Sequence, residues 1–304
     1  MKPLRDFYSF NSFQREPCVF ASASATSADA GYSILTYAEL LEKIASIRFH
    51  NPELQLLYRG QRKDYALNAS GEQAKISSLY PSIFRNHPEF AESKIRPPDY
   101  VRRSYDLLEN ASDNLIKNAE QGLTGTIVSL LRKHRLLRWA IIQHYEIVDT
   151  PLLDVSPSLD VALSFAANPA SGFLYVIGLP MQTDILTSSI VESTQSISLP
   201  QFCPPGFLRP HFQNGFLIGE YPPVENYQNH TRGESRGKYN FSQRLVAKFK
   251  IMSFEQFQES GFSKLNKSIL MPENDSFLPI SAKIKSAISD EKKQLKSDLL
   301  QKRT

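Results

Sequence analysis

The order of helical and strand-like segments is the feature that most restricts how this chain can fold. Stretches with apolar residues at helical spacing dominate the first half, whereas strand-like apolar runs dominate only after Gly172. A doubly wound parallel sheet needs strands and helices in regular alternation, which this order does not provide. We therefore predict an α+β fold with a mixed, mainly antiparallel sheet. The predicted helices are 36–50, 99–122, 127–145 and 159–167, and the predicted strands are 54–58, 172–179, 216–219 and 244–252.

Residues that favour helix ends support these boundaries. Thr36 and Glu39 form a capping-box pair, and Ser158 precedes a short apolar helix as an N-cap residue. The small-residue stretch ASASATSADA is typical of a loose segment near the amino terminus. The predicted divisions of the chain are a flexible leader at 1–33, a domain at 34–280 with a helical insertion at about 99–145, and a lysine-rich, solvated helical tail at 281–304.

Composition and charge argue against a membrane protein and a nucleic-acid-binding protein. The 304 residues are 41% hydrophobic and 22% charged, which is ordinary for a globular protein, and the net charge is only +4. No run approaches the roughly 18 to 20 consecutive apolar residues that span a bilayer. The basic stretch RKHRLLRW at 132–139 is better explained as a solvated helix face with Trp139 in the core. Strong salt-dependent binding of DNA or RNA would contradict that interpretation.

The amino terminus and the two cysteines favour a cytoplasmic protein. The opening residues MKPLRDFYSFNSF contain no uninterrupted apolar region, so we expect no signal peptide. Cys18 and Cys203 provide neither a metal-ligand spacing nor a disulfide framework.

Three groups of polar residues are candidates for chemistry, and each also allows a plainer interpretation. Arg59 ends an apolar strand, where it either reaches water or holds an anion in a pocket. His144 lies next to phenolic and acidic groups, where it acts either as an acid or base or as a structural hydrogen-bonding residue. Ser156 and Ser158 flank a proline at a helix start, where they either cap the helix or help to bind an anion.

Four motifs in a fixed order resemble the FRG domain family, named for its Phe/Tyr-Arg-Gly motif. They are YRGQ at 58–61, LYPSIFR at 79–85, the run QHYEIVDTPLLDVSPSLDVALSFAA from Gln143, and FQNGFLIG at 212–219. The chain departs from the family pattern at four positions. Glu146 replaces glycine, Pro151 replaces arginine and Val155 replaces tryptophan. Asn214 lies in the last motif, which is usually richer in glutamine in this family.

The same order of elements is similar, more weakly, to ADP-ribosyltransferases of the Arg-Ser-Glu type. In that family an arginine holds a phosphate of NAD, a serine element braces the nicotinamide pocket, and a glutamate stabilises the cationic transition state. Arg59 matches the arginine, Ser156 and Ser158 match the serine element, and Gln213 takes the approximate place of the glutamate. This resemblance implies a sheet split around a ligand cleft.

Together the resemblances imply a site that binds NAD. We expect no metal, because no second histidine or carboxylate lies at i+4 from His144 on the same helix face. The expected catalytic residues are Arg59, His144 and Gln213. The expected cofactor-binding residues are Tyr58, Arg59, Gly60, Gln61, Asp154, Ser156 and Ser158. We expect Gly60 to let the backbone turn tightly beside the ligand.

Glutamine in place of glutamate leaves two functions open. Gln213 can orient a ribose hydroxyl, but it carries no charge to stabilise an oxocarbenium-like centre, which costs about 10²–10³ in rate. Strand alternation places Glu220 on the face opposite Gln213, so another acid such as Glu146 would be needed. The chain is then either an NAD-binding ADP-ribosyltransferase-like enzyme or NAD hydrolase of toxin or defence type, or a non-catalytic module that binds a nucleotide or a protein. A protein target or an antitoxin-like partner would fit the first function.

Overall fold

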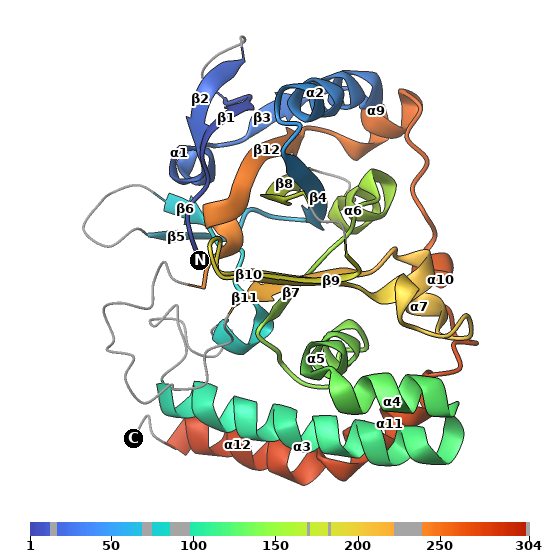
Figure 1. Cartoon of the computed structure of the whole chain (residues 1–304). Coiled ribbons are helices and arrows are strands. Elements are labelled where there is room, and N and C mark those ends of the chain that lie inside the picture. Colours follow the sequence, from blue (N-terminus) through green and yellow to red (C-terminus); the bar gives the residue numbers. More distant parts are fainter. Residues whose placement is uncertain are drawn as a thin grey trace. The chain divides into compact units, whose positions relative to one another are not determined.

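A computed structural model describes residues 1–12, 17–68, 75–85, 98–168, 171–181, 184–221 and 239–301 (Figure 1). The chain divides into two compact units, each assembled from three separate segments. Unit 1 comprises 1–79, 155–193 and 240–270, and unit 2 comprises 80–154, 194–239 and 271–304.

The centre of unit 1 is a sheet with the strand order β3-β12-β8-β4. The strands β4 and β12 both pair antiparallel with β8, whereas β3 pairs parallel with β12. Because β4 and β12 are far apart in sequence but flank the same strand, the sheet can form only when the three segments of the unit come together. The strands are β3 (Tyr32–Ile34), β4 (Leu54–Gln61), β8 (Gly172–Pro180) and β12 (Leu245–Ile251).

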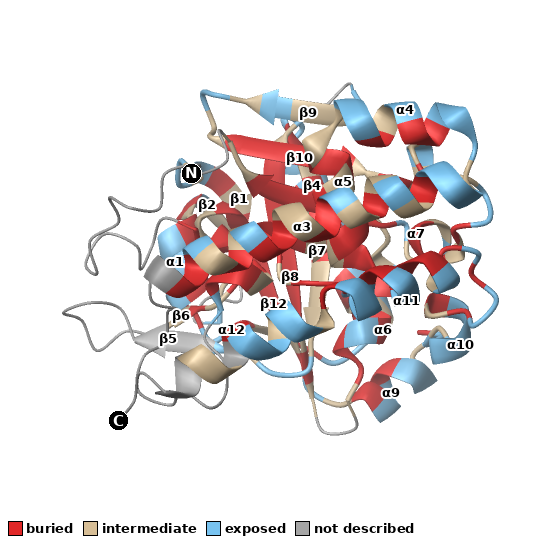
Figure 2. Ribbon diagram, turned by 90° about the horizontal axis from the view of Figure 1, so that it is seen from below, coloured by how far each residue is buried: buried red, intermediate tan, exposed pale blue. Residues whose placement is uncertain are grey.

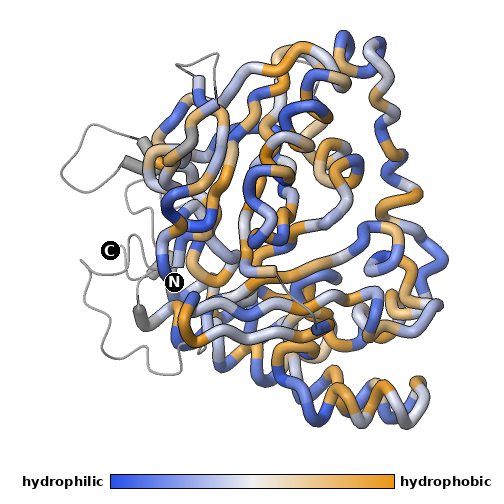
Figure 3. The backbone as a smooth tube through the Cα atoms, turned by 45° about the horizontal axis from the view of Figure 1, so that its top comes forward, coloured by the Kyte–Doolittle hydropathy of each residue, from blue (hydrophilic) through white to orange (hydrophobic). Residues whose placement is uncertain are grey.

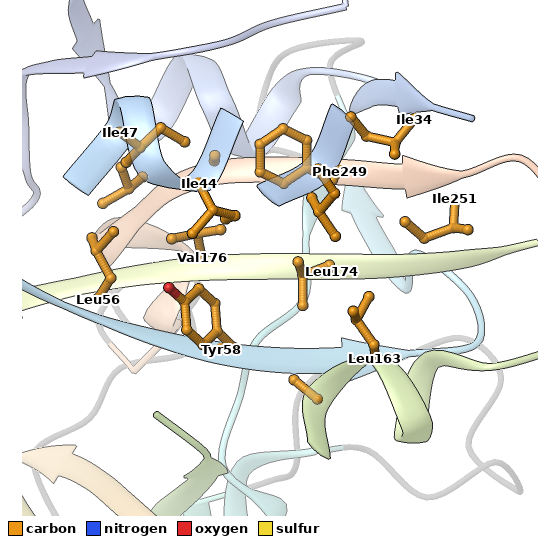
Figure 4. Close-up of a cluster of buried hydrophobic side chains, with 14 of the residues drawn as sticks. Ile34, Ile44, Ile47, Leu56, Tyr58, Leu163, Leu174, Val176, Phe249 and Ile251 are labelled. Carbon is orange, nitrogen blue, oxygen red and sulfur yellow. The ribbon is translucent and has the colours of Figure 1, made fainter. Parts of the chain in front are cut away.

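One face of this sheet forms the core of unit 1. Alternate residues of the strands point to this face, including Leu56 and Tyr58 of β4 and Leu174 and Val176 of β8 (Figure 4). Two helices contribute buried residues to the same cluster, α2 (Tyr37–His50) through its Leu40, Ile44 and Ile47, and α6 (Leu159–Ala166) through its Ala162, Leu163 and Ala166. As predicted, Thr36 caps α2 by accepting a hydrogen bond from the Glu39 backbone N–H.

The amino-terminal segment differs from the predicted leader at 1–33. It forms two antiparallel strands and a short helix, and it buries Phe7 and Phe10 in the core of unit 1. Burial of these two aromatic side chains supplies the apolar contact that outweighs the small-residue composition of the stretch. The elements are β1 (Arg5–Ser9), β2 (Cys18–Ser22) and α1 (Ala23–Ala28).

Several short elements complete unit 1. They are β5 (Ala66–Asn68), which pairs antiparallel with β6 (Lys75–Ser77), β9 (Leu186–Ser189), η4 (Phe241–Arg244), α9 (Phe254–Glu259) and α10 (Lys267–Leu270).

Unit 2 is mainly helical. The predicted helix at 127–145 is two helices, because His134 has an extended backbone with φ −114° and ψ 97°. The helix α3 alternates buried and exposed residues along its length (Figure 2), as its amphipathic sequence predicts. The helices of this region are α3 (Pro98–Gly122), α4 (Gly125–Lys133) and α5 (Arg135–His144).

The carboxy-terminal segment is helical, as predicted, but it is packed and not fully solvated. Ile284 and Ile288 are completely buried, and Arg103 of α3 forms an ion pair with Asp298 at 2.6 Å. Apolar residues among the lysines therefore place this segment against α3. Its helices are α11 (Leu278–Ala287) and α12 (Ser289–Gln301), and residues 302–304 of the predicted tail lie outside the described residues.

The strands of unit 2 follow the order β7-β11-β10, and β10 and β11 are antiparallel. The strand β7 lies in the run that the sequence identified only as the approach to a helix. It was missed because its four residues are too few to show a period. The remaining elements are η1 (Ser82–Phe84), β7 (Leu152–Val155), β10 (Thr194–Ser198), η2 (Leu199–Gln201), α7 (Leu208–Phe212) and β11 (Phe216–Glu220).

The structure confirms an α+β fold with predominantly antiparallel, open sheets. Hydrophilic and hydrophobic residues intermingle along the tube in Figure 3, and no described helix is both long and apolar enough to cross a membrane.

Candidate functional site

The Tyr-Arg-Gly segment is held in an extended conformation by backbone pairing with the strand β8 on one side and with a single residue, Ser156, on the other. On one side, Arg59 is paired with Tyr175 of β8. On the other side, the backbone N–H and C=O of Tyr58 exchange two hydrogen bonds of 2.8 Å with Ser156. Since β4 continues to Gln61, the prediction that the strand ends at Arg59 and Gly60 is wrong.

Gly60 is required by the packing of α6 on β4. A Cβ atom at this position would lie 1.8 Å from the carbonyl oxygen of Ala162 and 2.8 Å from the backbone nitrogen of Ala166. The strand and the helix therefore touch through their backbones, which only glycine permits. The sequence suggested a tight turn beside a ligand, but the structure shows a close contact within the fold instead.

Both serines of the Ser-Pro-Ser segment act as acceptors at the start of α6. The Ser156 hydroxyl accepts a hydrogen bond from the Ser158 backbone N–H at 3.1 Å, and the Ser158 hydroxyl accepts one from the Val161 N–H at 3.4 Å. Ser158 is therefore the N-cap residue, as predicted. Asp160 lies in the first turn, where it accepts a hydrogen bond from the Tyr37 hydroxyl at 2.7 Å.

Tyr58 and Arg59 point to opposite faces of the sheet. The Tyr58 ring lies in the core and its hydroxyl accepts a hydrogen bond from Arg48 at 3.3 Å (Figure 4). Arg59 shares the other face with its register partner Tyr175, and Lys248 of β12 is the next residue in that row. The second face of the sheet therefore carries a polar row across three strands.

An ion pair lies within this polar row. Lys248 is 2% exposed, and its Nζ donates hydrogen bonds to Asp64 at 3.0 Å and to the Ser77 hydroxyl at 3.0 Å. The Tyr175 hydroxyl donates to the other Asp64 oxygen at 2.9 Å. Burial, followed by the charge of and the hydrogen bond to Asp64, raises the pKa of Tyr175 well above its usual range. This network ties the loop after β4 to the strand partners of Arg59.

His144 and Asp154 face each other in unit 2. The His144 Nδ1 lies 3.5 Å from an Asp154 carboxylate oxygen, and the Gln143 side chain donates a hydrogen bond of 2.7 Å to the other oxygen. Gln143 is itself oriented, because its carbonyl oxygen accepts hydrogen bonds from Thr150 at 2.7 Å and from Ser82 at 3.1 Å. The carboxylate is therefore held by two neighbouring residues at the end of α5.

The segment 209–215 packs against the His144 residue and restricts the position of its imidazole. A Cβ atom on Gly215 would lie 2.8 Å from the His144 Cε1 atom, so the ring packs directly on the glycine backbone. Arg209 donates a hydrogen bond to the His144 carbonyl at 3.3 Å, and its own backbone N–H is bound by the buried Asp275. His144 is 6% exposed, and its Nε2 is buried with no hydrogen-bond partner among the described residues.

Gln213 lies before the late strand, as the predicted strand at 216–219 implies. It terminates α7, with its N–H bonded to the Arg209 carbonyl, and β11 begins only at Phe216. The intervening Asn214 has a φ of 44°, which breaks the alternation used to compare Gln213 with Glu220. That comparison is therefore wrong, although Glu220 does lie at the end of β11.

The predicted residues fall into two groups, one in each unit. Tyr58, Arg59, Gly60, Gln61, Ser156 and Ser158 belong to unit 1, whereas His144, Asp154 and Gln213 belong to unit 2. Among the residues that the structure describes, no group of histidine, cysteine and acidic side chains could hold a metal ion.

Sequence reasoning missed the supporting residues Gln143, Gly215 and Lys248. Gln143 and Gly215 lie inside the motifs QHYEIVDTPLLD and FQNGFLIG. Their presence in these motifs was the only indication in the sequence that they belong to the site. A buried lysine in an alternating strand gives no such signal, because its partner Asp64 comes from a distant part of the chain.

A family model described as the FRG domain matches residues 54–172, a stretch inside the domain predicted at 34–280. It spans β4, the helices α3, α4 and α5, and the strand and helix that follow them. Searches of curated proteins and of solved structures gave no significant match.

Proposed function

This chain carries an FRG domain at residues 54–172, and we propose that it binds NAD as an ADP-ribosyltransferase-like enzyme or NAD hydrolase of toxin or defence type. The observation that best supports this proposal is the fixed backbone position of Arg59. Its strand is bonded to β8 on one side and to Ser156 on the other, and α6 packs on the adjacent glycine. Because this backbone is already fixed, no backbone entropy is lost when the guanidinium binds a phosphate, and its planar fork suits a phosphate group.

The proposed chemistry needs a held diphosphate and a stabilised ribose cation. Arg59 would receive a phosphate of NAD through a planar, bidentate pair of hydrogen bonds. The bond between the nicotinamide nitrogen and the ribose carbon then breaks with its electron pair leaving on nicotinamide. Water, or a nucleophile of a protein target, forms the new bond to that carbon and releases a proton to solvent.

A second candidate is a non-catalytic module that binds a nucleotide or a protein partner. Two observations favour it: Pro151 stands where the family has arginine, and Gln213 is an uncharged residue at the end of α7. This candidate predicts that NAD stabilises the protein without being consumed.

Calorimetry with NAD and an assay of NAD consumption test the proposal. We expect Arg59→Lys, which keeps the charge but loses the planar pair of donors, to weaken NAD binding about tenfold. Arg62→Ala is the matched control, because Arg62 is an exposed arginine three residues further along the chain. If millimolar NAD gives no heat of binding with the wild-type protein, the proposal is wrong. Binding without consumption supports the second candidate.

The partners and the compartment follow from the same proposal. A nucleotide is the expected small ligand, and a protein target or an antitoxin-like protein is the expected macromolecular partner. We propose a cytoplasmic location, which agrees with two cysteines that are free thiols in the structure. Modified proteins found by mass spectrometry after incubation with NAD and a cell extract would identify the target.

A further inference from the structure

Three basic side chains of unit 2 come together near the carboxylate of Glu146, just after α5. Arg209 belongs to α7, Lys285 to α11 and Lys292 to α12. We propose that this basic cluster, Arg209, Lys285 and Lys292, binds the phosphate group of a small molecule. The proposal does not depend on NAD binding by Arg59, because every residue of the cluster belongs to unit 2.

Two of the three cations are fixed by the loop that follows α5. Arg209 donates a hydrogen bond to the His144 carbonyl at 3.3 Å, and the Lys292 Nζ donates one to the Ile147 carbonyl at 3.0 Å. The Arg209 guanidinium also lies 5.6 Å from the centre of the Tyr145 ring, and its side chain is only 10% exposed. Both cations are therefore in place before a ligand arrives, which lowers the conformational entropy that binding costs.

Lys285 is the third cation, and it does not hold the loop. It is exposed, and it forms neither a hydrogen bond nor an ion pair with the residues that the structure describes. Partial desolvation lowers the pKa of Lys285, and the nearby charge of Glu146 raises it. The charges of Arg209 and Lys292 lower it further, so all these groups lie within electrostatic range of one amine. Its three N–H donors are available to a ligand.

Glu146 compensates the basic cluster only in part. Its carboxylate lies 4.0 Å from the Arg209 Nη2 atom, which is too long for a hydrogen bond, and its side chain is 70% exposed. Three cations beside one carboxylate leave positive charge in excess, and a phosphate monoester carries a charge of about −1.5 to −2 at pH 7. A phosphate group therefore suits the cluster, and it competes there with a loosely held carboxylate.

A second carboxylate near Arg209 does not occupy the cluster. Asp275 is 2% exposed and accepts hydrogen bonds from the Tyr145 hydroxyl and from the backbone N–H groups of Arg209 and Phe277. Its charge is not among those that act on Lys285. The exposed part of the cluster is therefore basic.

Phosphorus-31 NMR of inorganic phosphate, titrated into the full chain at low salt, tests the site. We expect Lys285→Gln to weaken phosphate binding about fivefold, because one charge contact is lost. Lys283→Gln is the matched control and should change the affinity less than about twofold. Lys283 is an exposed residue of the same helix, and side chains two positions apart do not share a helix face. Circular dichroism verifies that each variant is folded.

The competing role of Glu146 has its own readout. Glu146→Gln should strengthen phosphate binding about fivefold, because the carboxylate no longer competes for the cations. Glu146→Gly should have the same effect and should fold, since the φ of 53° at this position suits glycine. The effects of Glu146→Gln and Lys285→Gln should not add in the double variant, because both side chains belong to one site.

Three outcomes would overturn the inference. The first is no binding of millimolar phosphate by either the wild-type protein or Glu146→Gln. The second is an equal loss of affinity in Lys285→Gln and Lys283→Gln, which would show that binding is unspecific. The third is tighter binding of a polyglutamate peptide than of phosphate, which would assign the cluster to an acidic protein partner. NAD binding is measured separately, so the proposed function and this inference can fail independently.

Discussion

Arg59 in unit 1 and Asp154 in unit 2 are fixed in position by different kinds of contact. Backbone hydrogen bonds to β8 and Ser156, together with the helix packed on Gly60, hold the strand of Arg59. Side chains hold Asp154, through a hydrogen bond from Gln143 and the imidazole of His144. The backbone around Arg59 is therefore part of the fold of unit 1, whereas the position of Asp154 in unit 2 depends on a few replaceable side chains.

The difference has a consequence for mutagenesis. Changes around Arg59 should affect stability together with any binding, because the same backbone contacts serve both. Changes around Asp154 should separate the two effects, because side-chain contacts and not backbone pairing orient it.

The largest expected effect is that of Gly60→Ala. The new Cβ would overlap the backbone of α6, which cannot move as a flexible side chain can. We expect a loss of more than about 4 kcal/mol in the free energy of unfolding, enough to unfold a marginally stable protein. Gly125→Ala is the control, since a Cβ there meets nothing within 4 Å. Equal urea midpoints for the two variants would show that backbone contact does not hold the strand.

Next in size is Lys248→Met, which leaves the Asp64 carboxylate without its buried cation. We expect a loss of about 3 kcal/mol in urea unfolding, and a recovery of most of it when Asp64→Asn is added. Lys293→Met is the control, because its ion pair with Asp290 is largely exposed and should contribute under about 0.5 kcal/mol. Additive effects of Lys248→Met and Asp64→Asn would contradict the pairing.

A smaller effect is expected for Gly215→Ala in unit 2. The added Cβ meets the edge of the His144 ring, which can shift by rotation at a cost of about 1–2 kcal/mol. The clearer readout is NMR of the imidazole, whose signals should change because the ring moves relative to Asp154. Unchanged imidazole signals would show that Gly215 does not position the His144 ring.

The smallest effect concerns Tyr37, which joins α2 to the first turn of α6. Burial, then the hydrogen bond to and the charge of Asp160, raises the pKa of Tyr37 to about 12. Below about pH 10 the hydroxyl is protonated in both states, so its stabilisation is complete. Between about pH 10 and 12 the unfolded chain releases its proton first, so stability falls as pH rises.

Tyr37→Phe should reduce this alkaline loss by less than about 1 kcal/mol, because the group is partly exposed and screened. Carbon-13 NMR of labelled tyrosines should show one signal, absent from Tyr37→Phe, that titrates near pH 12. Titration near pH 10 would mean that Asp160 does not anchor Tyr37.

Local patterns in the sequence were sufficient for several elements of the fold. The Thr36 cap, the amphipathic helix α3 and the Ser158 cap depend on residues within one or two turns of each other, and the structure contains all three. The break at His134 was not predicted, because apolar spacing continues through it and no proline or glycine marks it.

The candidate site was only partly accessible from the sequence. Motif order led to Arg59, His144 and Asp154, but the sequence reasoning assigned Gly60 to a turn and compared Gln213 with Glu220 as though one continuous strand joined them. Both errors have one cause, which is that a motif gives the identity of residues and not the conformation of the backbone that carries them.

The sequence by itself determined the α+β class, the caps of the main helices and the identity of the polar residues in the FRG motifs. Tertiary structure decided that Gly60 lies under α6, that Lys248 pairs with Asp64, and that Asp154 is more exposed than His144. Each of these facts depends on residues that are distant in the chain or on the depth of a side chain in the fold. Local spacing carries no information on either, because contact and burial arise only when separate segments pack together.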